Sequence, residues 1–205
     1  RGVYTFCMCP GGVVVGAASE EGGVVTNGMS YFARDGENAN SALLVDVRPE
    51  DCGADDPDAP LAGIDFQEKL EKAAYELGGG GYIAPAQTLA DFLKGKDPDA
   101  SCTPVDPTYR PGVRYADLTK CLPAFVTDAM REAHPRMASK LKGFDMDTAV
   151  MIGVETRSSS PVRIPRDRET MKSINAQGIY PGGEGAGYAG GIMSAAVDGI
   201  KIAEK

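Results

Sequence analysis

The residues with the clearest chemical meaning are the glycines of the closing stretch, residues 178–205, which read GIYPGGEGAGYAGGIMSAAVDGIKIAEK. Residues 185–190 fit the G-x-G-x-x-G spacing of dinucleotide-binding turns. Such a unit also needs a second strand and an acidic residue about 20 positions later, and this sequence shows neither after the helix. The glycines instead predict a strand that passes into a helix with bare backbone N–H groups, which attract an anion or an electron-rich oxygen. A turn that merely lets strand and helix pack closely is the alternative.

Two cysteines near the beginning form a second candidate. Cys7 and Cys9 stand two positions apart on a predicted strand, so both thiols are expected on one face. A redox pair or half of a soft-metal site is conceivable, but a metal site needs four ligands and the single histidine, His134, is far away in sequence. We therefore predict no metal. Two alternatives remain for these cysteines: they pack as small apolar side chains, or they lie beside a cofactor or substrate.

The basic residues concentrate in one place, at Arg157, Arg163, Arg166 and Arg168. Guanidinium groups suit carboxylate or phosphate, so Arg157 and Arg163 are candidates for contact with an anionic cofactor or substrate. Arg157 is favoured because small hydroxyl side chains flank it. Carboxylates lie among these arginines, however, so ordinary surface pairing is the alternative.

Composition and charge exclude several classes of protein. The 205 residues carry a formal net charge of −8, which argues against a nucleic-acid partner. No apolar run approaches the length of a membrane span and the beginning lacks a signal-peptide pattern, so we expect a cytoplasmic protein with no membrane partner. Five sparse cysteines fit a reducing compartment. His134 is expected to be satisfied or exposed, and no hydrolase or phosphoryl-transfer motif is present.

The elements that must position these residues are strands at both ends of the chain and helices between them. A hairpin is expected around the turn at 19–23, followed by a strand at 41–47. The predicted helices cover 66–77, 87–93, 192–204 and parts of 116–141, where Pro123 and Pro135 should start or break a helix. Residues 94–112 should be irregular, and strands return at 149–155, 162–164 and 178–181. This order predicts an α+β fold with a mixed sheet that joins the first 50 residues to 149–164.

Four stretches together resemble the uncharacterised bacterial FAD-dependent dehydrogenases, the NAD(FAD)-utilising dehydrogenase-like flavoproteins. They are FCMCPGG at 6–12, TNGMSY at 26–31 with RDGENANSA at 34–42, GVETRSSSPVRI at 153–164, and the closing glycine-rich stretch. The matches occur in order and span nearly the whole chain, which makes them specific.

The resemblance implies that this chain is the C-terminal part of a two-domain flavoprotein. The partner would be a missing N-terminal FAD-binding Rossmann domain, so the chain alone is expected to be inactive and not to retain FAD. One structural unit is expected, with residues 1–50 and 147–175 as the β-rich substrate side, 66–142 as the helical part, and 176–205 as the flavin-facing strand and helix. The implied cofactor contacts are Gly182, Gly183, Glu184, Gly185, Ala186, Gly187, Tyr188, Gly190 and Gly191.

Two functions follow as hypotheses. The first is the substrate-side part of an FAD-dependent oxidoreductase that acts on a small molecule, with the helix N-terminus near the pyrimidine oxygen of the flavin, where it would stabilise negative charge. Cys7 and Cys9 would then lie beside flavin or substrate. The alternative is a non-catalytic ligand-binding or interaction module that keeps a flavoprotein-derived fold.

Overall fold

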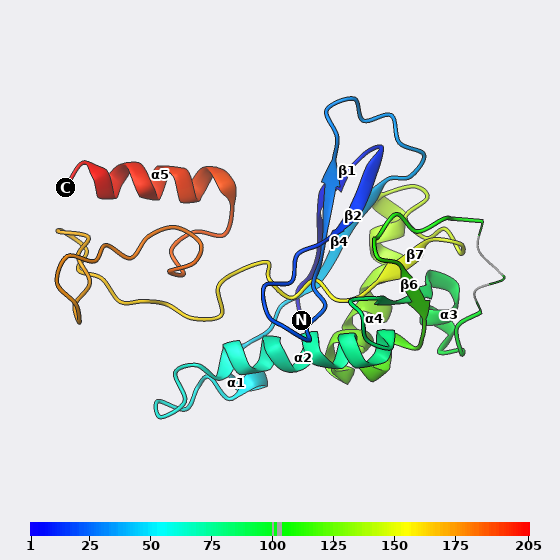
Figure 1. The fold of residues 1–205 in the computed structure, drawn as a ribbon, viewed down its shortest axis with the longest axis horizontal. Coiled ribbons are helices and arrows are strands. Elements are labelled where there is room, and N and C mark those ends of the chain that lie inside the picture. Colours follow the sequence, from blue (N-terminus) through cyan, green and yellow to red (C-terminus); the bar gives the residue numbers. More distant parts are fainter. Residues whose placement is uncertain (100, 102–103) are drawn as a thin grey trace. The chain divides into compact units, whose positions relative to one another are not determined.

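A computed structural model describes residues 1–99, 101 and 104–205, and its chain divides into two compact units. The first unit comprises Arg1–Val47 and Glu68–Thr156, and the second comprises Arg48–Gln67 and Arg157–Lys205. Figure 1 traces the elements of each unit along the sequence. Cys7, Cys9, Cys52 and Cys121 are free thiols, whereas Cys102 lies outside the described residues.

Two antiparallel strand pairs begin the first unit. Strand β1 (Val3–Cys9) pairs with β4 (Asn40–Val45), and β2 (Gly12–Gly16) pairs with β3 (Thr26–Ser30). The predicted hairpin is confirmed, although its second strand begins later than expected. Val24 and Val25 are buried just before β3 instead of alternating along it.

A separate three-stranded sheet corrects one expectation. Strand β5 (Ala84–Thr88) lies between β6 (Val113–Tyr115), which is parallel to it, and β7 (Val150–Ile152), which is antiparallel. The expected mixed sheet is therefore wrong in its pairing, because β7 pairs with β5 and not with the N-terminal strands. The sequence analysis missed β5 because APAQT lacks the run of branched side chains that usually marks a strand. All five residues of β5 are buried.

The helices confirm the α+β class. They are α1 (Pro49–Cys52), α2 (Ala62–Gly78), α3 (Leu89–Lys94), α4 (Ala124–Lys140) and α5 (Ile192–Ala203), with a short 3-10 helix at Leu118–Lys120. Pro123 caps the beginning of α4 as expected, but Pro135 lies inside the helix without ending it. Val126, Met130 and His134, spaced four residues apart, are buried along one side of α4, and this packing offsets the lost backbone hydrogen bond.

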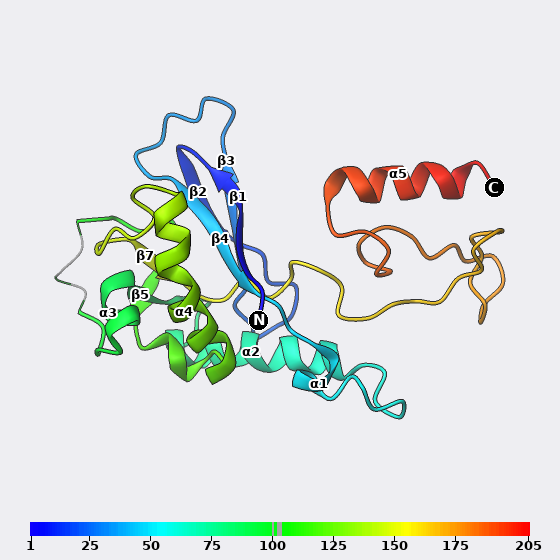
Figure 2. The ribbon, with the colours of Figure 1, turned by 180° about the vertical axis from the view of Figure 1, so that it is seen from behind.

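The hydrophobic core belongs to the first unit. Its buried apolar residues are Val24, Ala74, Ala84, Phe92, Tyr109, Leu118, Cys121, Val126, Met130 and Val154. Helix α4 lies along the strand pair of β1 and β4, as Figure 2 shows from behind. None of the helices in the described residues is long and apolar enough to cross a membrane.

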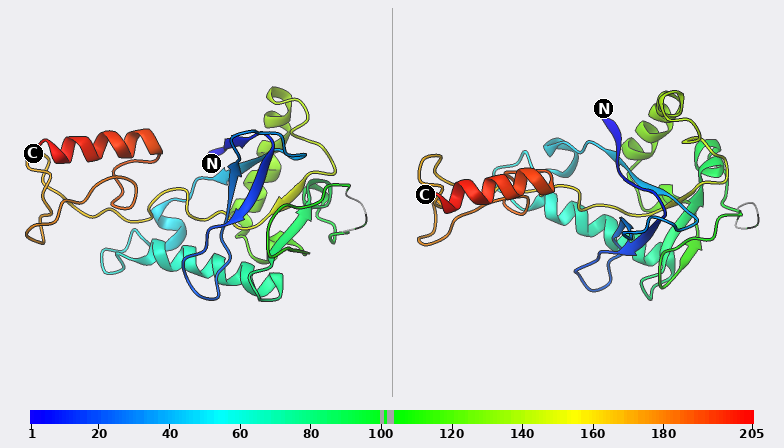
Figure 3. Two further views of the ribbon diagram at one scale, coloured as in Figure 1. Left: turned by 45° about the horizontal axis from the view of Figure 1, so that its top comes forward. Right: turned by 90° about the horizontal axis from the view of Figure 1, so that it is seen from above.

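The second unit has little regular structure apart from α5, the short α1 and the beginning of α2. Neither of the strands expected at 162–164 and 178–181 forms, and a single bridge joins Arg166 to Ser173. Among its described residues, the buried apolar side chains are those of Ala186 and Pro181. Figures 1 and 3 show α5 in red alongside the orange stretch that leads into it.

Candidate functional site

The glycine loop, residues 182–191, is the element that the sequence marked most strongly, and it lies entirely in the second unit. It leads into α5, whose N-cap Gly191 is extended and offers no side-chain cap to the first turn. The first N–H groups of a helix have no partner within the helix, and together they carry a partial positive charge. The predicted helix with a bare N-terminus is therefore confirmed.

Individual glycines of this loop serve different purposes. Gly187 has φ +79, and a side chain there would meet the backbone of Val162 and Arg163. A side chain at Gly182 would collide with the end of Ile202. At Gly185, by contrast, an added Cβ meets no atom within 4 Å and the backbone is not left-handed. The loop conformation thus requires glycine at Gly187, whereas a side chain at Gly182 would clash only with the flexible end of Ile202, and Gly185 leaves an open stretch of backbone.

The carbonyl groups of the loop are turned toward the protein. Tyr188 N–H donates to Gly183 O at 2.9 Å, and Gly187 N–H donates to Glu184 O at 2.9 Å. The next three carbonyls accept from Ser160 Oγ at 3.2 Å, from Ile164 N at 3.2 Å and from the Arg163 guanidinium at 2.8 and 3.1 Å. The backbone carbonyls of five consecutive residues, 183–187, thus all accept hydrogen bonds.

The amide groups of the loop show the opposite pattern. Across the described part of the chain, no protein acceptor is found for the N–H groups of Glu184, Gly185 and Ala186. Those at the beginning of α5 are likewise free of the helix ladder. In residues 183–187 the carbonyls are thus hydrogen-bonded while three amide donors have no acceptor among the described residues, so this part of the loop is suited to an anion or an electron-rich oxygen.

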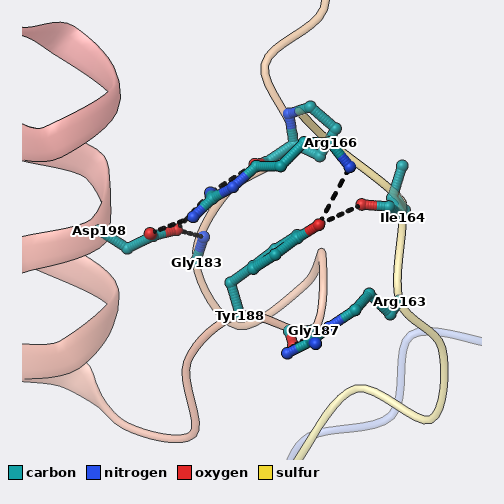
Figure 4. Close-up of polar contacts among 8 residues, drawn as sticks. Arg163, Ile164, Arg166, Gly183, Gly187, Tyr188 and Asp198 are labelled. Atoms are coloured by element: carbon teal, nitrogen blue, oxygen red, sulfur yellow. Dashed lines mark hydrogen bonds and ion pairs between the residues drawn. The ribbon is translucent and has the colours of Figure 1, made fainter. Parts of the chain in front are cut away.

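A buried ion pair ties this loop to α5 (Figure 4). Arg166 donates to both carboxylate oxygens of Asp198, at 2.8 and 2.6 Å, and to Pro181 O at 2.8 Å. The two side chains are only 9% and 12% exposed. Asp198 Oδ2 also accepts a 2.9 Å hydrogen bond from Gly183 N–H. One carboxylate thus connects the helix, the arginine and the beginning of the loop.

These contacts control the protonation of Asp198. The hydrogen bonds from the Arg166 guanidinium, and then from Gly183 N–H, lower the pKa of Asp198 to about 2. The same pairing raises the pKa of Arg166. Both groups therefore stay charged at neutral pH.

Tyr188 lies between two arginines. The Arg166 guanidinium stands 3.8 Å from the ring centroid, and that of Arg163 stands 4.7 Å from it. The Tyr188 hydroxyl accepts from Arg166 N–H and donates to Ile164 O, each at 3.1 Å. Figure 4 shows the ring edge-on between the two arginines.

Of the two predicted anion contacts, Arg163 joins this group and Arg157 does not. Arg163, Arg166, Arg168, Tyr188, Pro165 and Met171 line an open hollow of about 610 Å³. Arg157 is exposed and is not part of this lining. The flanking hydroxyl groups that favoured Arg157 are partly used elsewhere, since Thr156 donates to Glu71 and Ser160 to Gly185.

The predicted cysteine pair lies in the first unit and departs from the expected geometry. The register of β1 shifts between Phe6 and Cys9, and Cys7 has a left-handed backbone with φ +51. Simple alternation along the strand therefore does not describe the two thiols. Cys9 Sγ donates to Cys7 O at 3.1 Å. Cys7 is exposed, and partial desolvation, followed by the Glu155 carboxylate and the Cys9 thiol, raises its pKa.

His134 was expected to be satisfied or exposed, and this expectation is wrong. The ring is 3% exposed and packs on Phe144 with centroids 5.6 Å apart. Within the described residues, neither ring nitrogen has a hydrogen-bond partner. Its place on the inner side of α4 explains the burial, because it follows Val126 and Met130 at the same helical spacing.

Sequence reasoning missed Asp198 and did not select Arg166. A signal for Asp198 was present, because it is a lone carboxylate in the otherwise apolar run IMSAAVDGI. A charge at such a position is usually paired when it is buried. Nothing in the sequence showed which of the four arginines would pair with it. A search of the described residues for groups of three or more His, Cys, Asp or Glu side chains that could hold a metal ion finds none.

Comparison with known proteins assigns the chain to a class. A family model described as "FAD-dependent protein, C-terminal domain-like" matches residues 1–158. The chain belongs to this family, as the resemblance of its four stretches implied. An uncharacterized protein from Clostridium beijerinckii is 52% identical over 204 residues, which cover 100% of this chain and 37% of that relative. The chain thus spans little more than a third of the relative's length.

The limit of the family match nearly coincides with a structural boundary. The match ends at residue 158, and the first unit ends at Thr156. The glycine loop and α5 thus lie beyond the family model, although the Clostridium relative is similar over essentially the whole chain.

Proposed function

We propose that this chain forms the substrate-side and C-terminal part of an FAD-dependent oxidoreductase, with the glycine loop facing the flavin. The observation that carries the proposal is the polarity of residues 183–187. Their carbonyls are hydrogen-bonded, the amides of 184–186 have no acceptor among the described residues, and the backbone is open at Gly185. A flat ring with carbonyl oxygens on one edge fits such a donor surface. The family's description as FAD-dependent supports the choice of flavin.

In this proposal the chain holds and orients the cofactor. The amides of residues 184–186 and the first turn of α5 would hold the flavin ring, with Gly182, Gly183, Gly187, Tyr188, Gly190 and Gly191 shaping the backbone around it. Bound FAD would supply the transfer of electrons or hydride. The positive end of α5 would stabilise negative charge near the pyrimidine ring.

A side chain at Gly185 tests this role directly. In the full-length protein that carries this chain, Gly185→Val should lower the flavin content per mole, because the added side chain blocks close approach to the backbone at a position where a Cβ meets no atom within 4 Å. Gly199→Ala is the matched control, since that helical position is also open and should leave flavin content unchanged. Full flavin content in Gly185→Val would mean that the loop is only a packing turn. A full-length protein without flavin would favour the non-catalytic binding module.

The partner we propose is an FAD-binding domain elsewhere in the full-length protein. The second unit buries almost no apolar side chains, yet α5 exposes Ile192 at 89%, Met193 at 75% and Ile200 at 59%. An apolar helix face of this kind usually marks an interaction surface. Because this chain covers only 37% of the Clostridium relative, that relative has ample sequence for such a domain.

A substitution on the exposed apolar face of α5 tests whether this helix contacts the proposed partner domain. Ile200→Gln should leave the stability of the 205-residue chain nearly unchanged, because the side chain is exposed there. In the full-length protein the same change should lower the melting temperature, since burial of the side chain would be lost. If Ile200→Gln changes the stability of both proteins equally, the proposed contact between α5 and the FAD-binding domain is wrong.

Without its partner, the chain is expected not to hold FAD. Contacts with the ADP half would be missing, and the flavin end would lose the effective concentration that those contacts provide. Titration with FAD should leave flavin fluorescence nearly unchanged through the micromolar range, which corresponds to binding weaker than roughly −8 kcal/mol. A yellow preparation that releases FAD on denaturation would contradict this expectation.

Residues that contact a small-molecule substrate are proposed in each unit by itself. In the first unit the candidates are Cys7 and Cys9 of β1. Arg163 and Arg157 remain candidates for an anionic group of cofactor or substrate. Steady-state kinetics of Arg157→Gln and Arg163→Gln in the full-length enzyme would distinguish them, because Arg163→Gln also removes support of Gly187.

A further inference from the structure

The geometry points to a positioning role for Arg166, Tyr188 and Asp198, which we infer hold the glycine loop, with its amides at residues 184–186 still without an acceptor, before any ligand binds. We call these three residues the loop clamp. The inference rests on the proposed function for the identity of the ligand. It goes beyond that function because it assigns residues that need not touch the flavin.

The loop clamp contacts the loop at both ends of the segment 183–188. At the beginning, Gly183 N–H is bound by Asp198 Oδ2 at 2.9 Å. At the end, Tyr188 contacts Arg166 through its ring at 3.8 Å and through its hydroxyl at 3.1 Å. Arg166 joins the two ends, because its guanidinium also pairs with Asp198.

The residues between these ends are then held in a closed path. Tyr188 N–H returns to Gly183 O, and Gly187 N–H returns to Glu184 O. Arg163 covers the far side of the Tyr188 ring and fixes Gly187 O. With both ends fixed and the carbonyls of residues 183–187 engaged, the amides of residues 184–186 are left without an acceptor among the described residues.

Arg166 itself is poorly suited to bind an anion directly. Its Nη1 donates to Pro181 O and to Asp198, and its Nη2 donates to Asp198 at 2.6 Å. The carboxylate neutralises its charge, and the side chain is 9% exposed. These features argue for a structural fork that arranges the backbone and against a direct contact with phosphate.

Preorganisation is the physical advantage of such a clamp. A glycine-rich loop has many accessible conformations, and ordering it during binding would weaken the complex. A clamp that is already closed removes that cost from the binding step. It also fixes the direction of the amides, on which stabilisation of developing negative charge depends.

Conservative variants of the full-length protein test this inference. Arg166→Lys keeps the charge but loses the fork, Asp198→Asn removes the ion pair but keeps an oxygen for Gly183, and Tyr188→Phe keeps the ring but loses the hydroxyl. Lys172→Gln is the control, because it removes an exposed positive charge from the same unit. Two quantities are measured: amide hydrogen exchange of the flavin-free protein, and the affinity and midpoint potential of bound flavin.

We expect Arg166→Lys and Asp198→Asn to accelerate exchange at Gly183, Gly187 and Tyr188 by about tenfold or more, with the first unit unaffected. Flavin affinity should fall by about tenfold or more, and the midpoint potential should shift. Tyr188→Phe should show a smaller change in the same direction, and Lys172→Gln none. The shift in potential separates positioning from loss of folding, which would release flavin altogether.

Two results would overturn the clamp: exchange at the wild-type rate in Arg166→Lys and Asp198→Asn, or faster exchange with unchanged flavin affinity and potential. Failure of the proposed function has a different signature, namely a wild-type full-length protein that neither contains nor binds flavin. In that case the exchange measurement still decides whether the clamp orders the loop.

Discussion

Thr156 donates a 2.7 Å hydrogen bond from its hydroxyl to Oε1 of Glu71, a contact between residues that are 85 positions apart. Glu71 is 1% exposed, and its backbone carbonyl accepts from Val24 N–H at 3.1 Å. The same residue of α2 therefore connects to the segment before β3 and to the last residue of the first unit. Buried carboxylates require such partners, because their desolvation is costly.

Removal of this hydroxyl should destabilise the first unit. Thr156→Val keeps the shape but deprives Glu71 of one donor, so the free energy of unfolding should fall by about 1–3 kcal/mol. Urea denaturation followed by circular dichroism measures the change. Thr156→Ser keeps the hydroxyl and should lose much less, and a loss in Thr156→Ser as large as that in Thr156→Val would contradict the stabilising role of the hydroxyl.

Burial of His134 predicts a dependence of stability on pH. Burial lowers the pKa of His134, and the Asp145 carboxylate opposes this only in part. The unfolded state therefore binds the proton more readily. The resulting stability is fully present above about pH 6.5, the ordinary histidine value, and is lost as the pH falls below it toward the lower folded-state pKa.

Replacement of His134 by phenylalanine should remove this dependence. His134→Phe eliminates two unpartnered nitrogens and keeps the stacking on Phe144, so it should also stabilise the protein near pH 7 by about 1 kcal/mol. Unfolding free energies measured from pH 7.5 to 5 test both statements. The hypothesis fails if the variant loses stability on acidification as steeply as the wild type.

The thiols of β1 should react slowly at neutral pH. The pKa of Cys7 is raised by partial desolvation, by Glu155 and by Cys9, so less of it is thiolate than in a free cysteine. Burial raises the pKa of Cys121 to about 12, and that thiol should remain unlabelled in the folded chain. Alkylation rates of the individual cysteines, measured by mass spectrometry as a function of pH, test this prediction. Fast stoichiometric labelling of Cys7 at pH 7 would instead support a redox role.

Acid should open the pairing of Arg166 with Asp198. The lowered pKa of Asp198, about 2, means that this pair contributes stability above the unfolded value near 3.9 and loses that contribution as the pH falls toward 2. The carboxyl carbon shift of Asp198, followed by nuclear magnetic resonance, should titrate near pH 2. Arg166→Gln should return the midpoint toward 3.9, and an unchanged midpoint in that variant would contradict the assigned cause.

The sequence predicted elements whose signals are local. The hairpin of β2 and β3 follows from valine-rich runs around a turn, and α5 follows from an apolar run after glycines. Strand β5 escaped prediction because its identity depends on partners far along the chain, β6 and β7. Pro135 is tolerated for a similar reason, since the burial of His134 and Met130 is a tertiary effect.

The candidate site also has features that the sequence predicts and features that it does not. Its glycines stand out in the sequence, and their position before a helix was predictable. The pairing of Arg166 with Asp198 was not, because it joins residues 32 positions apart across a stretch with no regular strand. The sequence does not distinguish the four arginines from one another. Only the path of the backbone determines which of them lies close enough to α5 to pair with Asp198.

The contact between Glu71 and Thr156 also has a consequence for the order of synthesis. The strand pairs of the first 45 residues can form while the rest of the chain is still on the ribosome. Strand β5 remains open along one edge until Val150–Ile152 emerges, and Glu71 lacks its hydroxyl donor until Thr156 follows. Local pairs form quickly and distant ones slowly, so a nascent chain passes through a stage in which the central strand is paired along one edge only. A ribosome stalled before Val150–Ile152 has emerged would therefore hold this chain with one edge of β5 open to other chains.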